Sequence, residues 1–112
     1  MSELTEAEFL RQVIDLAEIY HWSYVHFRPA QTARGWRTPV QGPLGKGWPD
    51  LILVRGDRLL AVELKAEKGR ITEDQLHVMD ILDGAGFETA FWRPSDFGAI
   101  QAALGLASGN ER

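Results

Sequence analysis

The sequence predicts a single α/β domain with a mixed central sheet and helices on both of its faces. Three observations predict it: two helical patterns that begin with capping boxes, two apolar runs joined by a turn dipeptide, and a further strand after the second helix. The expected order is helix, three strands, helix, strand, helix. The chain has 112 residues, 45% hydrophobic and 25% charged, which is typical of one globular domain. We assign this domain to residues 1–107, before a polar tail at 108–112.

The first elements are a helix, a strand and a loop. Thr5 and Glu8 have the spacing of a capping box, and apolar residues then recur at helical intervals, which predicts a helix over residues 5–20. Residues 22–28 alternate aromatic or β-branched residues with polar ones and predict a strand. Residues 29–49 are rich in proline and glycine and have little periodicity, so we expect a long loop. Loops of that length are usually functional.

The clearest structural signal is a β-hairpin in the middle of the chain. Residues 50–55 and 58–65 form two apolar runs separated by Gly56-Asp57, a typical turn dipeptide. Both runs are apolar on both faces, as expected for central strands covered by helices. If Arg55 pairs with Arg58, counting outward along the strands places Asp50 directly opposite Glu63.

A helix, a strand and a second helix complete the domain. Thr72 and Gln75 have the spacing of a second capping box, and the helix that follows should end at residues 84–86, which contain two glycines. Its predicted buried stripe consists of Leu76, Met79 and Leu82. Residues 87–92 predict the last strand, and Ser95 is expected to cap the terminal helix.

The predicted hairpin brings together side chains that suit phosphodiester hydrolysis. Directly opposed residues have Cβ atoms about 4.5–5.5 Å apart, so Asp50 and Glu63 would repel each other unless a divalent cation lay between them. Lys65 lies two residues beyond Glu63 and therefore on the same face. A metal there would activate water and neutralise phosphate, while the lysine orients or helps to deprotonate the water. The alternative is that Glu63 and Lys65 form a structural charge pair and Asp50 is an ordinary turn residue.

The same residues resemble a known family. The sequence GWPDL at residues 47–51, ELK at residues 63–65, and then Thr72 and Gln75, resemble the PD-(D/E)XK nuclease superfamily and, within it, the virus-type replication-repair nucleases (VRR-NUC domains). This resemblance implies a restriction-endonuclease-like core. It also implies Mg²⁺ or Mn²⁺ bound by Asp50, Glu63 and the Leu64 carbonyl, with Lys65 serving the water. Stand-alone domains of this size are expected to form homodimers that cut branched DNA, such as Holliday junctions or flaps.

The resemblance extends to a glutamate on the first helix and to Gln75. Glu6 precedes Phe9 by three residues, which places it on the buried stripe, whereas Glu8 is explained by the capping box with Thr5. We therefore choose Glu6 as a further catalytic and metal-binding residue, the alternative being a solvated acid at a helix start. Gln75 could either close its capping box or point into the site as the family's glutamine does.

Charge is distributed unevenly along the chain. The formal net charge is -4, yet no acidic residue occurs between Glu18 and Asp50. Basic residues of this segment are expected to contact DNA phosphates, and its aromatic residues could stack on bases. Alternatively, the aromatic residues form core and the cations are solvated. The predicted DNA-binding residues are His26, Arg28, Arg34, Arg37 and Lys46.

Several classes of function are excluded or disfavoured by composition. The chain has no cysteine, so any metal must be bound by oxygen or imidazole ligands. The Walker spacing is absent, so no nucleotide cofactor is expected. No apolar stretch of about 20 residues is present and the N-terminus is acidic, which predicts a cytoplasmic protein without a membrane partner. A non-catalytic DNA-binding module with a nuclease-like fold, or a hydrolase that acts on RNA, remain the alternatives to a DNA nuclease.

Overall fold

The computed structural model describes residues 4–27, 30–32, 35–37 and 40–106. Its elements follow the predicted order, with one additional hairpin inserted after the first strand. In chain order they are α1 (Glu6–Ile19), β1 (Ser23–His26), β2 (Ala30–Thr32), β3 (Gly35–Arg37), β4 (Leu51–Arg55), β5 (Arg58–Leu64), α2 (Glu73–Gly84), β6 (Glu88–Trp92), the short 3₁₀ helix η1 (Pro94–Asp96) and α3 (Phe97–Gly105).

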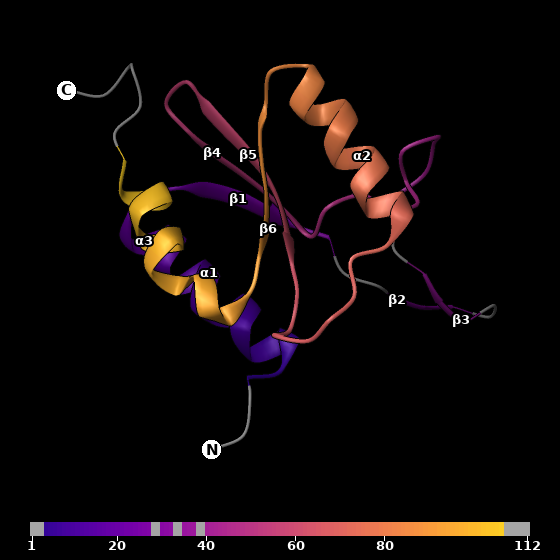
Figure 1. The fold of residues 1–112 in the computed structure, drawn as a ribbon, viewed down its shortest axis with the longest axis horizontal. Helices are drawn as coiled ribbons and strands as arrows, with labels where there is room; N and C mark the ends of the chain where they lie inside the picture. Colours follow the sequence, from indigo (N-terminus) through magenta and orange to yellow (C-terminus); the bar gives the residue numbers. More distant parts are fainter. Residues whose placement is uncertain (1–3, 28–29, 33–34, 38–39, 107–112) are drawn as a thin grey trace.

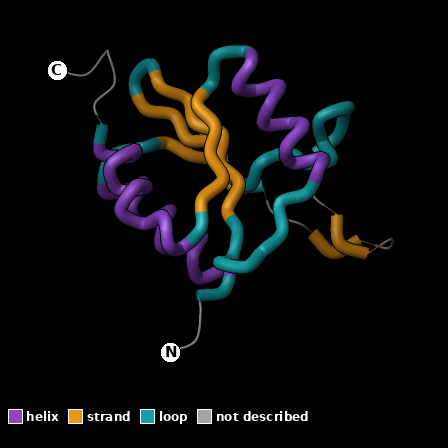
Figure 2. The backbone as a smooth tube through the Cα atoms, viewed as in Figure 1, coloured by secondary structure: helices purple, strands orange, loops and turns teal. Residues whose placement is uncertain are grey.

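A four-stranded mixed sheet forms the centre of the molecule. Its strand order is β1-β4-β5-β6, in which β4 is antiparallel to both of its neighbours and β6 runs parallel to β5. Helices α1 and α3 lie on one side of the sheet and α2 lies on the other (Figures 1 and 2). This arrangement confirms the predicted α/β class and is compatible with a restriction-endonuclease-like fold. The hairpin strands β4 and β5 are the two central strands, as predicted.

The register of the β4–β5 hairpin is the one that the sequence predicts. Leu51 pairs with Val62 at the open end and Arg55 pairs with Arg58 at the turn end. Gly56 has a φ of 61°, a left-handed conformation that glycine adopts without strain and that a two-residue hairpin turn requires. The next step outward from the pair of Leu51 and Val62 carries Asp50 to a position opposite Glu63.

The main core lies between the sheet and the helices α1 and α3. Both capping boxes are formed, by Thr5 with Glu8 and by Thr72 with Gln75, so the helices begin where the sequence predicts. Apolar residues of α1 at helical spacing meet the side chains of β4 and β5 that alternate onto this face. The fully buried residues of this core include Phe9, Val13, Leu51, Leu53, Val62, Ile100 and Leu104.

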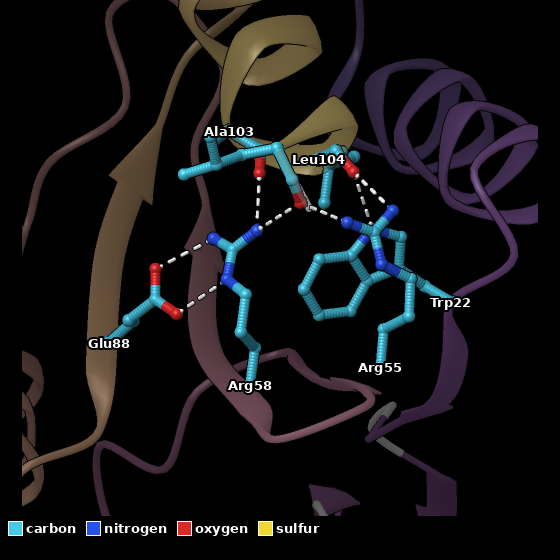
Figure 3. A network of polar contacts seen from close by, with 7 residues as sticks. Trp22, Arg55, Arg58, Glu88, Ala103 and Leu104 are labelled. Carbon is cyan, nitrogen blue, oxygen red and sulfur yellow. Dashed lines mark hydrogen bonds and ion pairs between the residues drawn. The ribbon is translucent and has the colours of Figure 1, made fainter. Parts of the chain in front are cut away.

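Hydrogen bonds connect the turn end of the hairpin to the carboxyl end of α3 (Figure 3). Arg58 donates from Nη1 to the carbonyls of Ala103 and Leu106, at 3.0 and 2.9 Å, and forms a bidentate pair with Glu88. Arg55 donates to the carbonyls of Tyr20, Leu104 and Leu106. Both guanidinium groups lie about 5 Å from the centroid of the Trp22 ring. These contacts satisfy carbonyls that the end of a helix leaves without partners.

Three details differ from the prediction. Residues 29–49 are not a continuous loop, because β2 and β3 pair as a short antiparallel hairpin. In α2 the buried residues are Val78 and Met79, whereas Leu76 is 48% exposed, because α2 covers only the β5–β6 part of its face. Ser95 does not cap α3, because its hydroxyl donates to Glu67 instead. No helix among the described residues is long and apolar enough to cross a membrane.

Candidate active site

Three carboxylates converge at the open end of the hairpin. Glu6 comes from the first turn of α1, Asp50 immediately precedes β4, and Glu63 lies near the end of β5. One oxygen from each of the three lies within 4.8 Å of the other two. Like charges at such separations repel one another strongly when water is excluded. The arrangement therefore has the composition and spacing of a site for a cation with oxygen ligands.

The position of Asp50 is fixed by its own backbone and by β5. Its carbonyl accepts a hydrogen bond of 2.8 Å from the N–H of Phe27, and its carboxylate accepts one of 2.8 Å from the N–H of Leu64. Burial raises the pKa of Asp50, although the hydrogen bonds from the Leu64 N–H and from the Glu63 side chain, and the charges of His26 and Lys65, act in the opposite direction. Asp50 is thus fixed by hydrogen bonds at a position where burial disfavours its ionised form.

Glu63 is the buried acid of the group, with only 4% of its surface exposed. Burial and the nearby Asp50 carboxylate raise its pKa to about 8, and the charge of Lys65 offsets this only in part. The Lys65 ammonium lies 3.7 Å from Glu63 Oε2, and its side chain is 12% exposed. The face that carries Glu63 therefore also carries Lys65, as strand alternation requires.

Gln75 fulfils both of the roles that the sequence left open. Its side-chain oxygen accepts from the N–H of Thr72 at 3.0 Å and so completes the capping box. Its side-chain nitrogen donates to Glu63 Oε2 at 2.9 Å. A single amide therefore couples the start of α2 to the orientation of the buried acid.

Gly47 lets the segment before Asp50 approach α2 closely. Its φ is 100°, and a Cβ at this position would lie 2.4 Å from the carbonyl oxygen of Asp74. Only glycine allows this contact, since both the conformation and the space exclude a side chain. The contact sets the path of the chain through Trp48 and the buried Pro49 to Asp50.

Glu6 and Glu8 make different contacts in the structure. Glu8 accepts from the N–H of Thr5 at 2.9 Å in the capping box, and these hydrogen bonds lower its pKa. Glu6 is exposed, so its predicted place on the buried stripe is wrong, because it lies in the first turn, ahead of the first buried residue, Phe9. It nevertheless lies with Asp50 and Glu63, and partial desolvation and the charge of Asp50 raise its pKa. The geometry thus groups Glu6, and not Glu8, with the other two carboxylates.

The predicted DNA-binding residues do not form one described surface. Lys46 lies 3.4 Å from Asp74 in an exposed ion pair, and His26 lines a groove between α1 and β1. The backbone of Arg37 belongs to β3, but its side chain is outside the description, and Arg28 and Arg34 lie outside the described residues. Trp22 is a core residue, so the alternative reading of the aromatic residues is correct at that position.

A contact around Arg93 was not anticipated from the sequence. Its side chain donates to the carbonyls of Ala66 and Glu67, immediately after Lys65. The only sequence signal is a cation directly after the last strand, β6. Recognising its role requires knowing that β5 and β6 are parallel neighbours whose carboxyl ends lie together.

Comparison with protein families agrees with this geometry. Residues 14–95 match the model of the VRR-NUC domain, and this span contains Asp50, Glu63, Lys65 and Gln75. Glu6 precedes the matched span, so the family match does not cover it. A comparison with curated proteins gives no match. Because the match covers most of the 112 residues, the chain belongs to the VRR-NUC family and is a nuclease-type domain.

Proposed function

We propose that this protein is a nuclease that uses Mg²⁺ or Mn²⁺ to hydrolyse phosphodiester bonds in DNA. The observation that carries the proposal is the group of three carboxylates, with oxygens within 4.8 Å of one another, beside the ammonium of Lys65. Membership of a nuclease family agrees with it. A nuclease of this type needs no nucleophile from the protein, because water attacks the phosphate.

The charge balance of the site fits a divalent cation. Among the described residues, the three carboxylates are opposed by Lys65, the charge of His26 and the hydrogen bonds donated by Leu64 and Gln75. Burial makes the remaining negative charge costly. Asp50, Glu63 and Glu6 would hold the cation together with the Leu64 carbonyl. When bound, the cation would neutralise the scissile phosphate and lower the pKa of a water molecule.

The chain's own residues supply orientation. Lys65 Nζ, 3.7 Å from Glu63, is placed to orient the attacking water and to stabilise charge on the phosphate. Gln75 fixes the rotamer of Glu63, because it is itself held by the backbone of Thr72. The Leu64 N–H fixes Asp50 in the same way. Such preorganisation reduces the reorganisation needed when the substrate binds.

The DNA substrate is proposed to be branched, as in Holliday junctions or flaps, and the protein to act as a homodimer. Two valines on the α2 side of the sheet, Val25 and Val54, are 48% and 41% exposed, because α2 covers the β5–β6 half of this face. A second copy could bury this apolar surface. The backbone of the DNA would be contacted by His26, Arg28, Arg34, Arg37 and Lys46. Light scattering of the purified protein tests the dimer.

A cleavage assay tests the proposed function. Linear, flap and four-way-junction DNAs are incubated with the protein in Mg²⁺, in Mn²⁺ and in EDTA. We expect cleavage that requires the metal and is fastest on the branched substrates. Asp50→Asn and Lys65→Ala should each reduce it by at least about 10²–10³-fold, the loss typical of removing one preorganised group. Asp83→Asn is a suitable control, because Asp83 is exposed near the end of α2, whereas Gln75 lies at the start of that helix.

The possible results distinguish a DNA nuclease from a non-catalytic DNA-binding module and from a hydrolase that acts on RNA. Binding to DNA that is insensitive to EDTA, with no cleavage of any substrate, would favour the non-catalytic module. Wild-type cleavage by Asp50→Asn or Lys65→Ala would remove that residue from the mechanism. An RNA version of the flap substrate distinguishes the remaining alternative, since a preference for RNA would contradict DNA as the substrate.

A further inference from the structure

Hydrogen bonds connect Lys65 and the segment that follows it to the end of the neighbouring strand, β6. The N–H of Lys65 donates to the Trp92 carbonyl at 2.9 Å, which extends the pairing of β5 with β6. Arg93 Nη1 then donates to the carbonyls of Ala66 and Glu67, at 2.8 and 2.9 Å. The backbone is therefore anchored at Lys65 and at the two residues after it.

The carboxylate of Glu67 supplies a further connection. It accepts from the Ser95 N–H at 2.9 Å and from the Ser95 hydroxyl at 2.7 Å. Arg93 is itself held, because its N–H donates to Asp96 Oδ2 at 2.9 Å. We refer to the three residues Arg93, Glu67 and Ser95 as the Lys65 clamp. The clamp joins the β5–α2 connection to η1 by hydrogen bonds that involve charged groups, which are stronger than those between neutral groups.

The clamped segment folds back over the stem of Lys65. The N–H of Gly69 donates to the Ala66 carbonyl at 2.9 Å, and a Cβ on Gly69 would lie 3.5 Å from Lys65 Cδ. The Lys65 side chain is only 12% exposed, whereas that of Lys46 is 87% exposed. A lysine side chain has several rotatable bonds, and holding its end in one place costs conformational entropy. The covering turn limits the positions that the ammonium can reach.

We propose that Arg93 is a positioning residue that places Lys65 for catalysis by holding the carbonyls of Ala66 and Glu67. This proposal rests on the proposed function, in which Lys65 serves the reaction. Arg93 acts through the backbone and does not itself touch the substrate. Displacing a catalytic group by about 1 Å can reduce a rate by about 10²-fold, so a clamp of this kind affects turnover more than binding.

Chemical labelling of lysines tests the clamp without any need for activity. Folded wild-type protein, Arg93→Ala and Arg58→Ala are treated briefly with an acetylating reagent, and the modification of each lysine is measured by mass spectrometry. Lys46 is the internal standard, because it is exposed in every variant. We expect Lys65 to be protected in wild type and in Arg58→Ala, and to be labelled at least about fivefold faster in Arg93→Ala, as expected when a covered amine becomes accessible.

Arg58→Ala is the matched control because Arg58, like Arg93, donates to backbone carbonyls but does so at the other end of the hairpin. Equal protection of Lys65 in folded Arg93→Ala and wild type would overturn the clamp, whatever the enzyme does. Deprotection in Arg58→Ala as well would attribute the effect to general destabilisation and would also overturn it. If Arg93→Ala does not fold, Glu67→Ala removes the Ser95 half of the clamp and is judged by the same criterion.

Steady-state cleavage then tests the link to catalysis. Arg93→Ala should lower kcat by about 10–10²-fold with KM for DNA changed less than about threefold, and Arg93→Lys should recover part of kcat by restoring a cationic donor. An unchanged kcat in a variant with a deprotected Lys65 would refute the positioning role. If the wild-type protein cleaves no substrate, the proposed function has failed and so has this catalytic role, whereas the labelling result still decides whether Arg93 orders Lys65.

Discussion

The two ends of the β4–β5 hairpin each place like charges opposite one another, but the groups that surround these charges differ between the two ends. At the turn end Arg55 pairs with Arg58, and both guanidinium groups are surrounded by carbonyls of α3, with Glu88 and the face of Trp22 close by (Figure 3). At the open end Asp50 and Glu63 face each other, and Glu6 adds a third carboxylate. At the turn end, carbonyls and Glu88 thus accept hydrogen bonds from the two guanidinium groups, whereas the open end has more carboxyl groups than cations among the described residues.

We interpret the paired charges at the turn end as structural and those at the open end as functional. A charged pair that finds internal partners contributes to stability, because hydrogen bonds replace contacts with water that are lost on burial. Like charges with too few internal partners destabilise the folded state, and binding of a ligand of opposite charge offsets that cost. Burial raises the pKa of Glu63 to about 8 at the open end, while Arg58 lowers the pKa of Glu88 at the turn end.

The largest effect on folding should come from the turn end. Arg58→Ala removes hydrogen bonds to two carbonyls of α3 and to Glu88 from a side chain that is 10% exposed. We expect the free energy of unfolding to fall by about 2–3 kcal/mol, the range for hydrogen bonds to charged groups. Denaturant unfolding measures this, with the exposed Arg11→Ala as the control, for which a loss below about 0.5 kcal/mol is expected. Similar losses in the two variants would mean that the network contributes little.

The dependence of stability on pH should differ between the ends. Because folding raises the pKa of Glu63 from 4.5 to about 8, its stabilising contribution is complete below 4.5 and is lost as the pH rises through 8. The lowered pKa of Glu88 has the opposite effect, so that contribution is present above 4.5 and is lost in acid. We therefore expect the Tm of the metal-free protein to fall as the pH rises from 4.5 to about 8.

A decline on the order of 5 °C corresponds to roughly 1 kcal/mol in a domain of this size. Thermal unfolding of wild type and Glu63→Gln, each with and without Mg²⁺, identifies its source. The substitution should remove most of the decline, and the remainder should come from Asp50 and Glu6, whose pKa values are also raised. Mg²⁺ should reduce the decline chiefly in wild type. A decline of equal size in Glu63→Gln would show that another group is responsible.

A further predicted effect distinguishes the two glutamates of α1. Glu6→Gln removes one of the three grouped carboxylates and should weaken Mg²⁺ binding by about tenfold, since affinity depends on the number of charged ligands. Glu8→Gln should leave it unchanged, because glutamine also completes a capping box. Titration of the metal into both variants measures the difference. An equal loss in both would indicate an indirect effect on the helix.

The features that could be predicted from the sequence are those determined locally. Capping boxes span four residues, and the turn dipeptide Gly56-Asp57 sets the register that brings Asp50 opposite Glu63. The strands β2 and β3 have only three residues each and lie in a segment rich in proline and glycine, so no alternation revealed them. The role of Arg93 depends on the parallel pairing of β5 with β6, two strands separated by a helix, which local patterns do not encode.

A calorimetric titration of Mn²⁺ into the wild-type protein and into Asp50→Asn asks most directly whether the open end of the hairpin binds a divalent cation. We expect saturable binding in wild type, its loss in Asp50→Asn, and its retention in Arg58→Lys, which alters only the turn end. Binding of equal affinity in wild type and Asp50→Asn, or no binding in either, would contradict the assignment of the carboxylate group as a metal site.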